Sequence, residues 1–123
     1  MLLDTHVLLW SLQQPERLSR TVLDIFRDAD TTIVVSVVIL WEVAIKTAVG
    51  KLQAPANLPD HVLSLGHEIL PVDARHAWRV QTLPLHHHDP FDRVLAAQAQ
   101  IEDLPLITHD RLLERYDIRI IRA

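Results

Sequence analysis

A buried strand that passes directly into an apolar helix is predicted by residues 31–45, Thr31-Thr32-Ile33-Val34-Val35-Ser36-Val37-Val38-Ile39-Leu40-Trp41-Glu42-Val43-Ala44-Ile45. The first part, Thr31–Ser36, is rich in β-branched residues, which favour strands. We expect the helix to run from Val37 to about Val49, because the following Gly50 is typical of the position just after a helix end. An apolar strand joined to a helix is the repeating unit of a parallel α/β sheet.

Strands and helices alternate on both sides of this unit. Further strands are expected at residues 1–4, 68–72, 105–108 and 118–121. Further helices are expected at residues 5–13, 19–28, 57–66, 73–82, 89–102 and 110–116, with a loop at residues 83–88. Continuously apolar strands that alternate with helices indicate a mostly parallel sheet covered on both faces. No linker divides the chain, so we predict an α/β fold in a single domain spanning residues 1–123.

Composition narrows the class of protein without deciding its function. The chain has 49% hydrophobic residues, only 2 glycines and no cysteine, which predicts a packed core and excludes a disulfide framework. No apolar run is long enough for a membrane span, and the start carries an early acid rather than a basic signal region. We therefore expect a soluble cytoplasmic protein without a membrane partner. The net charge of −4 argues weakly against nucleic-acid binding. If the four acids of the candidate site described next are left out, the net charge of the remaining residues is 0 (−4 + 4).

The four acids are Asp4, Glu42, Asp92 and Asp110, and each lies where an apolar segment ends or is interrupted. In open parallel sheets ligands bind beyond the carboxyl ends of the strands, and the expected topology brings all four acids to that edge. Gathered carboxylates repel one another by about 3 kcal/mol per pair at 5 Å and an effective dielectric constant near 20. A divalent cation removes this conflict, and oxygen ligands suit Mg²⁺ or Mn²⁺. The sequence therefore predicts a metal site.

Each acid also has a structural interpretation. Asp4 and Asp110 can cap the helices that follow them. Glu42 lies on an apolar helical stripe, where a buried glutamate paired with an arginine is the alternative to a metal ligand. In Asp89-Pro90-Phe91-Asp92 we predict that Asp89 is the helix N-cap and that Asp92 is the ligand.

Functional and structural interpretations also compete for several histidines, one lysine and the tryptophans. His86-His87-His88 is interpreted as a solvated loop, because consecutive loop residues rarely point at one ion. His6 and His109 flank site acids and can contact substrate or pack at the edge of the core, and Lys46 can contact phosphate or solvent. The tryptophans are predicted to belong to the core: Trp10, Trp41 and Trp78.

Four segments of the chain resemble the PIN-domain ribonucleases, in order and at the spacing of that family. They are Leu2–Trp10, Ser36–Lys46, His88–Ala99 and Leu106–Asp110, and they span nearly the whole chain. The third segment, which contains Asp89-Pro90-Phe91-Asp92-Arg93, is the most specific and is similar to the VapC-like toxin branch of type II toxin–antitoxin systems.

The resemblance implies a three-layer α/β/α fold and a Mg²⁺- or Mn²⁺-dependent endoribonuclease. By motif it assigns Asp4, Glu42, Asp92 and Asp110 to the acidic site, with Thr5 and Thr108 in support. It also implies an RNA substrate, a homodimer and a cognate antitoxin as partner. We expect the antitoxin to bind beside the early helices, where apolar residues are frequent: Leu8, Leu9, Trp10 and Leu12.

The expected reaction is attack of water on a phosphodiester, with the metal activating the water and stabilising phosphate charge. Such hydrolysis would leave 5′-phosphate and 3′-hydroxyl ends. Two other functions compete with it. A phosphatase of the haloacid-dehalogenase type also places an Asp after its first strand, but it needs a second Asp two residues on, where this chain has His6. A catalytically silent RNA- or protein-binding module of the same fold is the other alternative.

Overall fold

One five-stranded parallel sheet runs through the computed structural model, which describes residues 1–123. The strands are β1 (Leu2–Leu3), β2 (Val34–Ser36), β3 (Glu68–Leu70), β4 (Leu106–Thr108) and β5 (Ile120–Arg122). Their spatial order is β3-β2-β1-β4-β5, so the first strand lies in the centre. Every neighbouring pair is parallel, which confirms the predicted sheet.

The register aligns the carboxyl ends of the central strands. Leu2 lies opposite both Val34 and Leu106, and Leu3 lies opposite Ile107. The backbone N–H of Asp4 donates to the Ile107 carbonyl at 3.1 Å, so the residue after β1 still lies beside β4. Residues that follow these strands therefore meet at one edge of the sheet.

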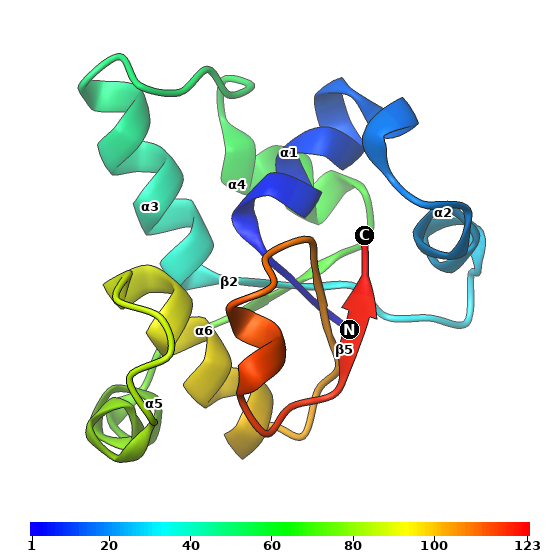
Figure 1. Ribbon diagram of the computed structural model, residues 1–123. Helices are drawn as coiled ribbons and strands as arrows, with labels where there is room; N and C mark the ends of the chain where they lie inside the picture. The colour runs from blue at the N-terminus through cyan, green and yellow to red at the C-terminus, as the bar shows by residue number, and fades with distance from the viewer.

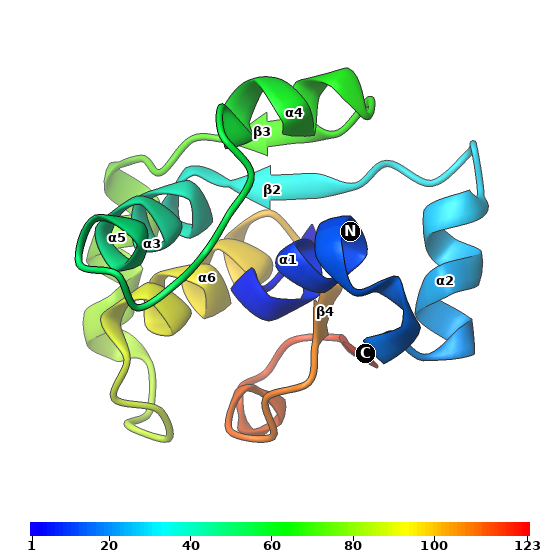
Figure 2. The same ribbon diagram turned by 90° about the horizontal axis from the view of Figure 1, so that it is seen from above.

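Helices cover both faces of the sheet, which confirms the three-layer α/β/α fold (Figure 1). They are α1 (Thr5–Gln13), α2 (Arg20–Arg27), α3 (Val37–Ala48), α4 (Leu58–Ser64), α5 (Ala74–Arg79) and α6 (Pro90–Ile101). Figure 1 shows α1 and α4 above the strands and α5 and α6 below them. Figure 2, seen from above, shows α3 extending from the end of β2 alongside α6.

The topology explains why the two faces are covered by different parts of the chain. The connections from β1 to β2 and from β2 to β3 step in one direction along the sheet. The connection from β3 to β4 steps back past β1, and right-handed crossovers then place its helices on the opposite face. The reversal of direction occurs between β1 and β4, and a cleft forms at such a point beyond the strand ends.

Three sequence-based expectations about elements and packing are wrong. The helix expected at residues 110–116 is a single 3₁₀ turn, Leu113–Arg115. Trp41 and Trp78 are exposed rather than buried, and only Trp10 packs partly against the core. Leu8 and Leu9 are buried, so they are core residues and not an apolar surface. A helix face that is apolar in sequence does not say which neighbour covers it.

Four of the large apolar side chains that remain exposed lie along α3 and at its C-cap, and the others lie elsewhere on the surface. Val37, Trp41, Ile45 and Val49 follow one another at intervals of four residues, which places them on one face of the helix. We call this face the α3 stripe. The opposite face of α3 carries Val38, Ile39 and Val43 into the core. None of the helices has the length and apolar character needed to cross a membrane.

Candidate active site

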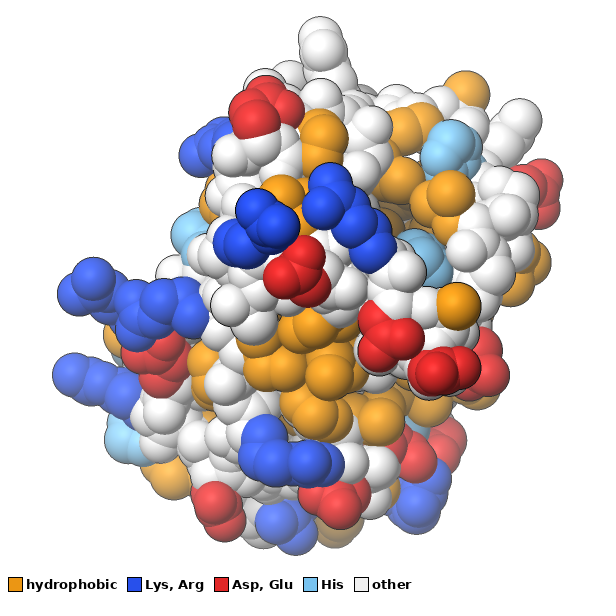
Figure 3. Space-filling model, turned by 90° about the vertical axis from the view of Figure 1, so that its right-hand side faces the viewer, with side chains coloured by type: hydrophobic (Ala, Val, Ile, Leu, Met, Phe, Trp, Pro, Cys, Tyr) orange, Lys and Arg blue, Asp and Glu red, His pale blue; other side chains and the backbone are white.

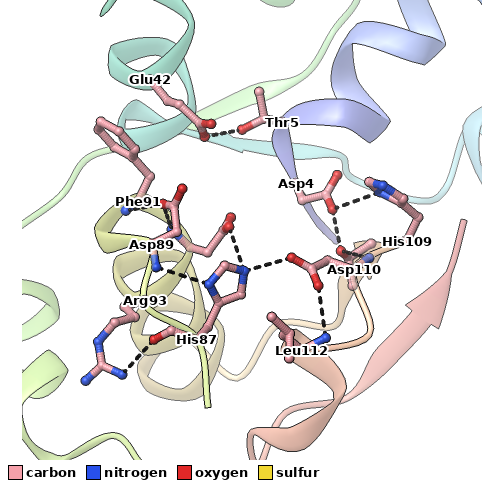
Figure 4. Close-up of polar contacts among 12 residues, drawn as sticks. Asp4, Thr5, Glu42, His87, Asp89, Phe91, Arg93, His109, Asp110 and Leu112 are labelled. Atoms are coloured by element: carbon pink, nitrogen blue, oxygen red, sulfur yellow. Dashed lines mark hydrogen bonds and ion pairs between the residues drawn. The ribbon is translucent and has the colours of Figure 1, made fainter. Parts of the chain in front are cut away.

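The four acids predicted from the sequence line one cleft at the carboxyl edge of the sheet. The cleft holds about 220 Å³ and no hydrophobic side chain lines it. Its lining residues are Asp4, Thr5, His6, Glu42, Lys46, His87, Asp89, Asp92, His109 and Asp110. Figure 4 shows side chains from α1, α3, α6 and the segment after β4 pointing toward one another across it. Burial of so many polar groups is costly unless they are hydrogen-bonded or paired with opposite charge. Their convergence in one cleft therefore points to a binding or catalytic site.

Asp4 is both a helix cap and a cleft residue. One carboxylate oxygen accepts a hydrogen bond from the Val7 N–H at 2.8 Å, which caps α1. The other accepts from the Thr108 hydroxyl at the end of β4. The same hydroxyl accepts from the Asp110 N–H at 3.0 Å, so Thr108 joins the two acids. Capping and a place in the site are therefore compatible for Asp4.

Asp110 likewise makes one contact with the local backbone and one within the cleft. Its Oδ1 accepts a hydrogen bond from the Leu112 N–H at 2.9 Å, while its Oδ2 points to the imidazole of His87 at 2.8 Å. The first bond orders the turn after β4, and the second holds the carboxylate toward the cleft.

Glu42 is only 5% exposed, and both of its carboxylate oxygens have partners. Oε1 accepts from the Thr5 hydroxyl and Oε2 accepts from the Lys46 ammonium, each at 2.5 Å. The hydrogen bond to Glu42 raises the pKa of Lys46. The arginine partner considered from the sequence is therefore replaced by Lys46, one helical turn further along α3.

The two neighbouring aspartates have different contacts. Asp89 Oδ1 accepts the N–H groups of Phe91 at 2.8 Å and Asp92 at 3.1 Å, so Asp89 is the N-cap of α6. Asp92 caps nothing, and its carboxylate lies 3.1 Å from His87. Asp89 is thus the N-cap that the sequence predicted, although it also lines the cleft, and Asp92 lines the cleft without a capping contact.

His87 is a cleft residue that sequence reasoning missed. The solvated-loop interpretation holds for the exposed His88, but His87 Nε2 lies 2.8 Å from Asp110 and 3.1 Å from Asp92. Its Nδ1 accepts the Asp89 N–H at 3.1 Å, and this pattern assigns the proton to Nε2. His87 therefore donates toward the two acids (Figure 4). Contacts of its loop with α6 and with the segment after β4 set this geometry, and no motif spacing reveals them.

The donor set of the cleft fits a divalent cation. Ligand atoms of His87, Asp92 and Asp110 all lie within 4.8 Å of one another, and Asp4 reaches the same cleft through Thr108. Carboxylate oxygens are the preferred ligands of Mg²⁺ and Mn²⁺. Glu42 is less suited to direct ligation than the three aspartates, because its Oε2 is already paired with the Lys46 ammonium. Lys46 and His87 already offset part of the repulsion among the acids.

Burial and neighbouring charge make Asp92 hard to ionise. Desolvation is the main cause, repulsion from Asp89, Glu42 and Asp4 adds to it, and His87 opposes it, so that the pKa of Asp92 is raised to about 7 from 3.8. The unfolded chain has released this proton by pH 5, while the folded chain keeps it to about pH 7. The stability of the metal-free protein should therefore fall as the pH rises through this window.

The same proton should compete with metal. A cation that binds Asp92 would have to displace this proton below pH 7, so the apparent affinity for Mn²⁺ is expected to fall about tenfold for each pH unit by which the pH is lowered. Calorimetric titration at several pH values would measure the slope, and Asp92→Asn should remove most of it. An affinity that does not change between pH 5 and 8 would contradict a ligand role for Asp92.

An all-parallel α/β sheet with a carboxylate-lined cleft at its carboxyl edge places the protein among α/β domains that bind ligands at strand ends. Residues 1–119 match the PIN domain family, so the chain belongs to the PIN domain family. Members of this family are generally nucleases and typically bind a divalent metal. No curated protein matches the chain in sequence.

Several solved structures share the fold. VapBC2 from Rickettsia felis, bound to a DNA fragment from the promoter, has 17% sequence identity and a TM-score of 0.75, with 99% of this chain and 97% of that chain covered. DNA-bound VapBC from Salmonella typhimurium has 18% identity and a TM-score of 0.69, with 98% of this chain and 96% of that chain covered. FitAcB from Neisseria gonorrhoeae has 21% identity and a TM-score of 0.67, with 98% of this chain and 95% of that chain covered.

Proposed function

We propose that the protein is a Mg²⁺- or Mn²⁺-dependent endoribonuclease that cuts RNA by water attack, and that it is the toxin of a toxin–antitoxin pair. The observation that carries the proposal is the meeting of Asp4, Glu42, Asp92 and Asp110 in one wholly polar cleft of a PIN domain. The fold shared with VapBC and FitAcB complexes supports the toxin assignment. We propose that it acts in the cytoplasm, where RNA substrates and an antitoxin would both be present.

Asp4, Asp92 and Asp110 would hold the cation, because none of these carboxylates is paired with a lysine or arginine, whereas Glu42 is paired with Lys46. When bound, the cation would supply positive charge at the scissile phosphate and acidify a water molecule. Thr108 fixes the direction of the Asp4 carboxylate, and His87 does the same for Asp92 and Asp110. Preorganised ligands lower the reorganisation needed at the moment of reaction.

Glu42, Thr5 and Lys46 form the opposite side of the cleft. The short Thr5–Glu42 and Lys46–Glu42 contacts hold the glutamate in one orientation, from which it can accept a proton from a water molecule. Lys46, whose side chain is 37% exposed, can turn from Glu42 toward a phosphate oxygen when RNA arrives. Glu42 would then act on the water rather than on the cation itself.

Incubation of the protein with total RNA in Mg²⁺, Mn²⁺ or EDTA tests the proposal. We expect discrete cleavage products with 5′-phosphate ends in either metal and none in EDTA. Binding of RNA without cleavage in any metal would instead favour the catalytically silent module, and would overturn the enzyme assignment.

The α3 stripe supports a homodimer. Val37, Trp41, Ile45 and Val49 are 39%, 59%, 41% and 64% exposed, an apolar area that a second copy would cover. We expect a dimer at micromolar concentration, and we expect Ile45→Lys with Val49→Lys to give a folded monomer. Val72→Lys, at an exposed apolar residue outside the stripe, is the matched control. Sedimentation that shows a strict monomer for the unaltered protein would refute the dimer.

An apolar hollow away from the acidic cleft offers a surface for the antitoxin. It holds about 390 Å³ beside α1, α2 and α4, and Ser11, Leu12, Pro15, Leu18, Leu23, Phe26, His61, Leu65 and His67 line it. Figure 3 shows the side of the molecule that carries α2, where apolar side chains gather between charged ones. An apolar groove of this kind suits the apolar face of an amphipathic helix.

Substitution within this hollow should weaken antitoxin binding. Leu65 is about half exposed, so Leu65→Lys should leave the fold intact and weaken the affinity for the protein encoded by the neighbouring gene by tenfold or more, about what a central interface contact contributes. Leu112→Lys, exposed but outside the hollow, should have no effect. Calorimetry or biosensor measurement compares the two, and equal affinities would place the antitoxin elsewhere.

A further inference from the structure

Three aromatic rings and one guanidinium form a cluster at the border of the acidic cleft. The ring of His109 lies 4.7 Å from that of Trp10 and 5.2 Å from that of His6, measured between centroids. His6 and Trp10 are 5.9 Å apart. The guanidinium carbon of Arg17 lies 4.3 Å from the centre of the Trp10 ring. We call this cluster the aromatic rim.

The aromatic rim lies directly beside the proposed reaction centre. His6 and His109 both line the cleft, and His109 Nδ1 is 3.8 Å from Asp4 Oδ2. His6 is the second residue of α1 and His109 follows β4, so the two central strands present them together. Figure 4 shows His109 on the outer side of Asp4, away from Glu42 and His87. A nucleotide whose phosphate lies at Asp4 therefore has the aromatic rim within reach of its base.

Neither histidine is needed to complete the core. His6 is exposed, and 43% of the His109 side chain is exposed. Trp10 is different, because it packs partly against the core, and its ring contacts both imidazoles. Arg17 covers part of Trp10 and leaves a positive charge on the outer side of the aromatic rim. The result is a supported aromatic surface with an open face and an adjacent cation.

Exposed aromatic rings next to a cation are the arrangement that single-stranded nucleic acid uses for its bases and phosphates. The base stacks on a ring, and the cation attracts the neighbouring phosphate. A base within a duplex is already stacked on both sides, so it must leave the helix before it can use such a surface.

We propose that the aromatic rim binds the base of the nucleotide next to the scissile phosphate. This inference rests on the proposed ribonuclease function. His6 and His109 make the stacking contact, Trp10 positions them, and Arg17 attracts the next phosphate along the strand.

Binding in EDTA separates stacking from catalysis. The probes are a fluorescein-labelled adenylate oligomer and an abasic ribose-phosphate oligomer of the same length. Both carry the same phosphates, so the ratio of their dissociation constants cancels the electrostatic contribution and reports the bases alone. The unaltered protein should bind the adenylate oligomer about tenfold more tightly than the abasic one.

Four variants decide which residues produce this preference. His6→Ala with His109→Ala should bring the ratio close to one, whereas His6→Phe with His109→Phe should preserve it, because phenylalanine keeps a stacking face. Trp41→Ala and Trp78→Ala remove the two other exposed tryptophans and should leave the ratio unchanged. Circular dichroism before and after melting confirms that each variant is folded.

The inference is overturned if the unaltered protein shows no preference for bases, or if the preference survives in the double alanine variant. Loss of the preference in Trp41→Ala or Trp78→Ala alone would place the base elsewhere and would also overturn it. The nuclease function fails separately: a protein that prefers bases in this assay but cuts no RNA in Mg²⁺ or Mn²⁺ keeps the aromatic rim and loses the enzyme assignment.

Discussion

Replacement of Asp92 by asparagine is expected to reduce RNA cleavage by roughly 10³-fold, because loss of one preorganised group that stabilises charge costs about 10²- to 10³-fold and a lost ligand also weakens metal binding. Asn keeps the shape and size of the side chain. In the absence of metal, the Asp92→Asn protein should be at least as stable as the unaltered protein, since burial already disfavours the ionised form of Asp92. Cleavage rates measured with saturating Mn²⁺, together with melting curves in EDTA, would check both expectations.

Asp89 is the matched control for this experiment, since it is an aspartate three residues earlier on the same helix end. Asp89→Asn should remain active and stable, because asparagine is an equally good N-cap. Asp89→Ala should lose about 1 kcal/mol of stability, the usual cost of a lost cap. If Asp89→Asn lost activity while Asp92→Asn kept it, the capping and ligand roles would have to be exchanged.

Substitution of Glu42 by glutamine should also abolish cleavage, and its effect on stability should reveal how the glutamate is held. Glutamine can keep the Thr5 hydrogen bond but loses the ion pair with Lys46. Lys46 is exposed enough to turn into solvent, so no buried charge is left without a partner. We expect a loss of about 1.5–2 kcal/mol in EDTA, the lower end of the range for one hydrogen bond to a charged group.

Lys46→Met supplies the other half of this comparison. It leaves the Glu42 carboxylate buried and unpaired, so it should cost about 3 kcal/mol in EDTA, more than Glu42→Gln. The double variant, Glu42→Gln with Lys46→Met, should regain part of the lost stability, because it no longer buries an unpaired Glu42 carboxylate. Urea unfolding of the four proteins measures the coupling. Strictly additive effects would show that the Lys46–Glu42 contact contributes nothing, and full activity of Glu42→Gln would remove the glutamate from the reaction.

The sequence alone predicted the parallel sheet and its helices because apolar strands and amphipathic helices carry local signals. The strand at Thr31–Ser36 and the helix that follows it are found almost as expected, as Val34–Ser36 and Val37–Ala48. Local signals were weaker near the chain end, where Asp110–Tyr116 forms only a short turn. A few residues with little periodicity do not distinguish a helix from a turn.

The meeting of the four acids also followed from the sequence, because parallel strands bring their carboxyl ends to one edge whatever the details of packing. The separation of Asp89 from Asp92 could be predicted for a similar reason. N-cap geometry is local, and it depends on residues within one helical turn.

Only the tertiary structure decided which side chains surround those acids. His87 enters the cleft because its loop is held by α6 and by the turn after β4, which are distant in the chain. Trp41 is exposed and Trp10 is partly buried for the same kind of reason, since the neighbours that cover a helix face come from elsewhere in the sequence. Periodicity determines that a helix has an apolar face, whereas packing determines what that face meets and which polar groups converge beside it.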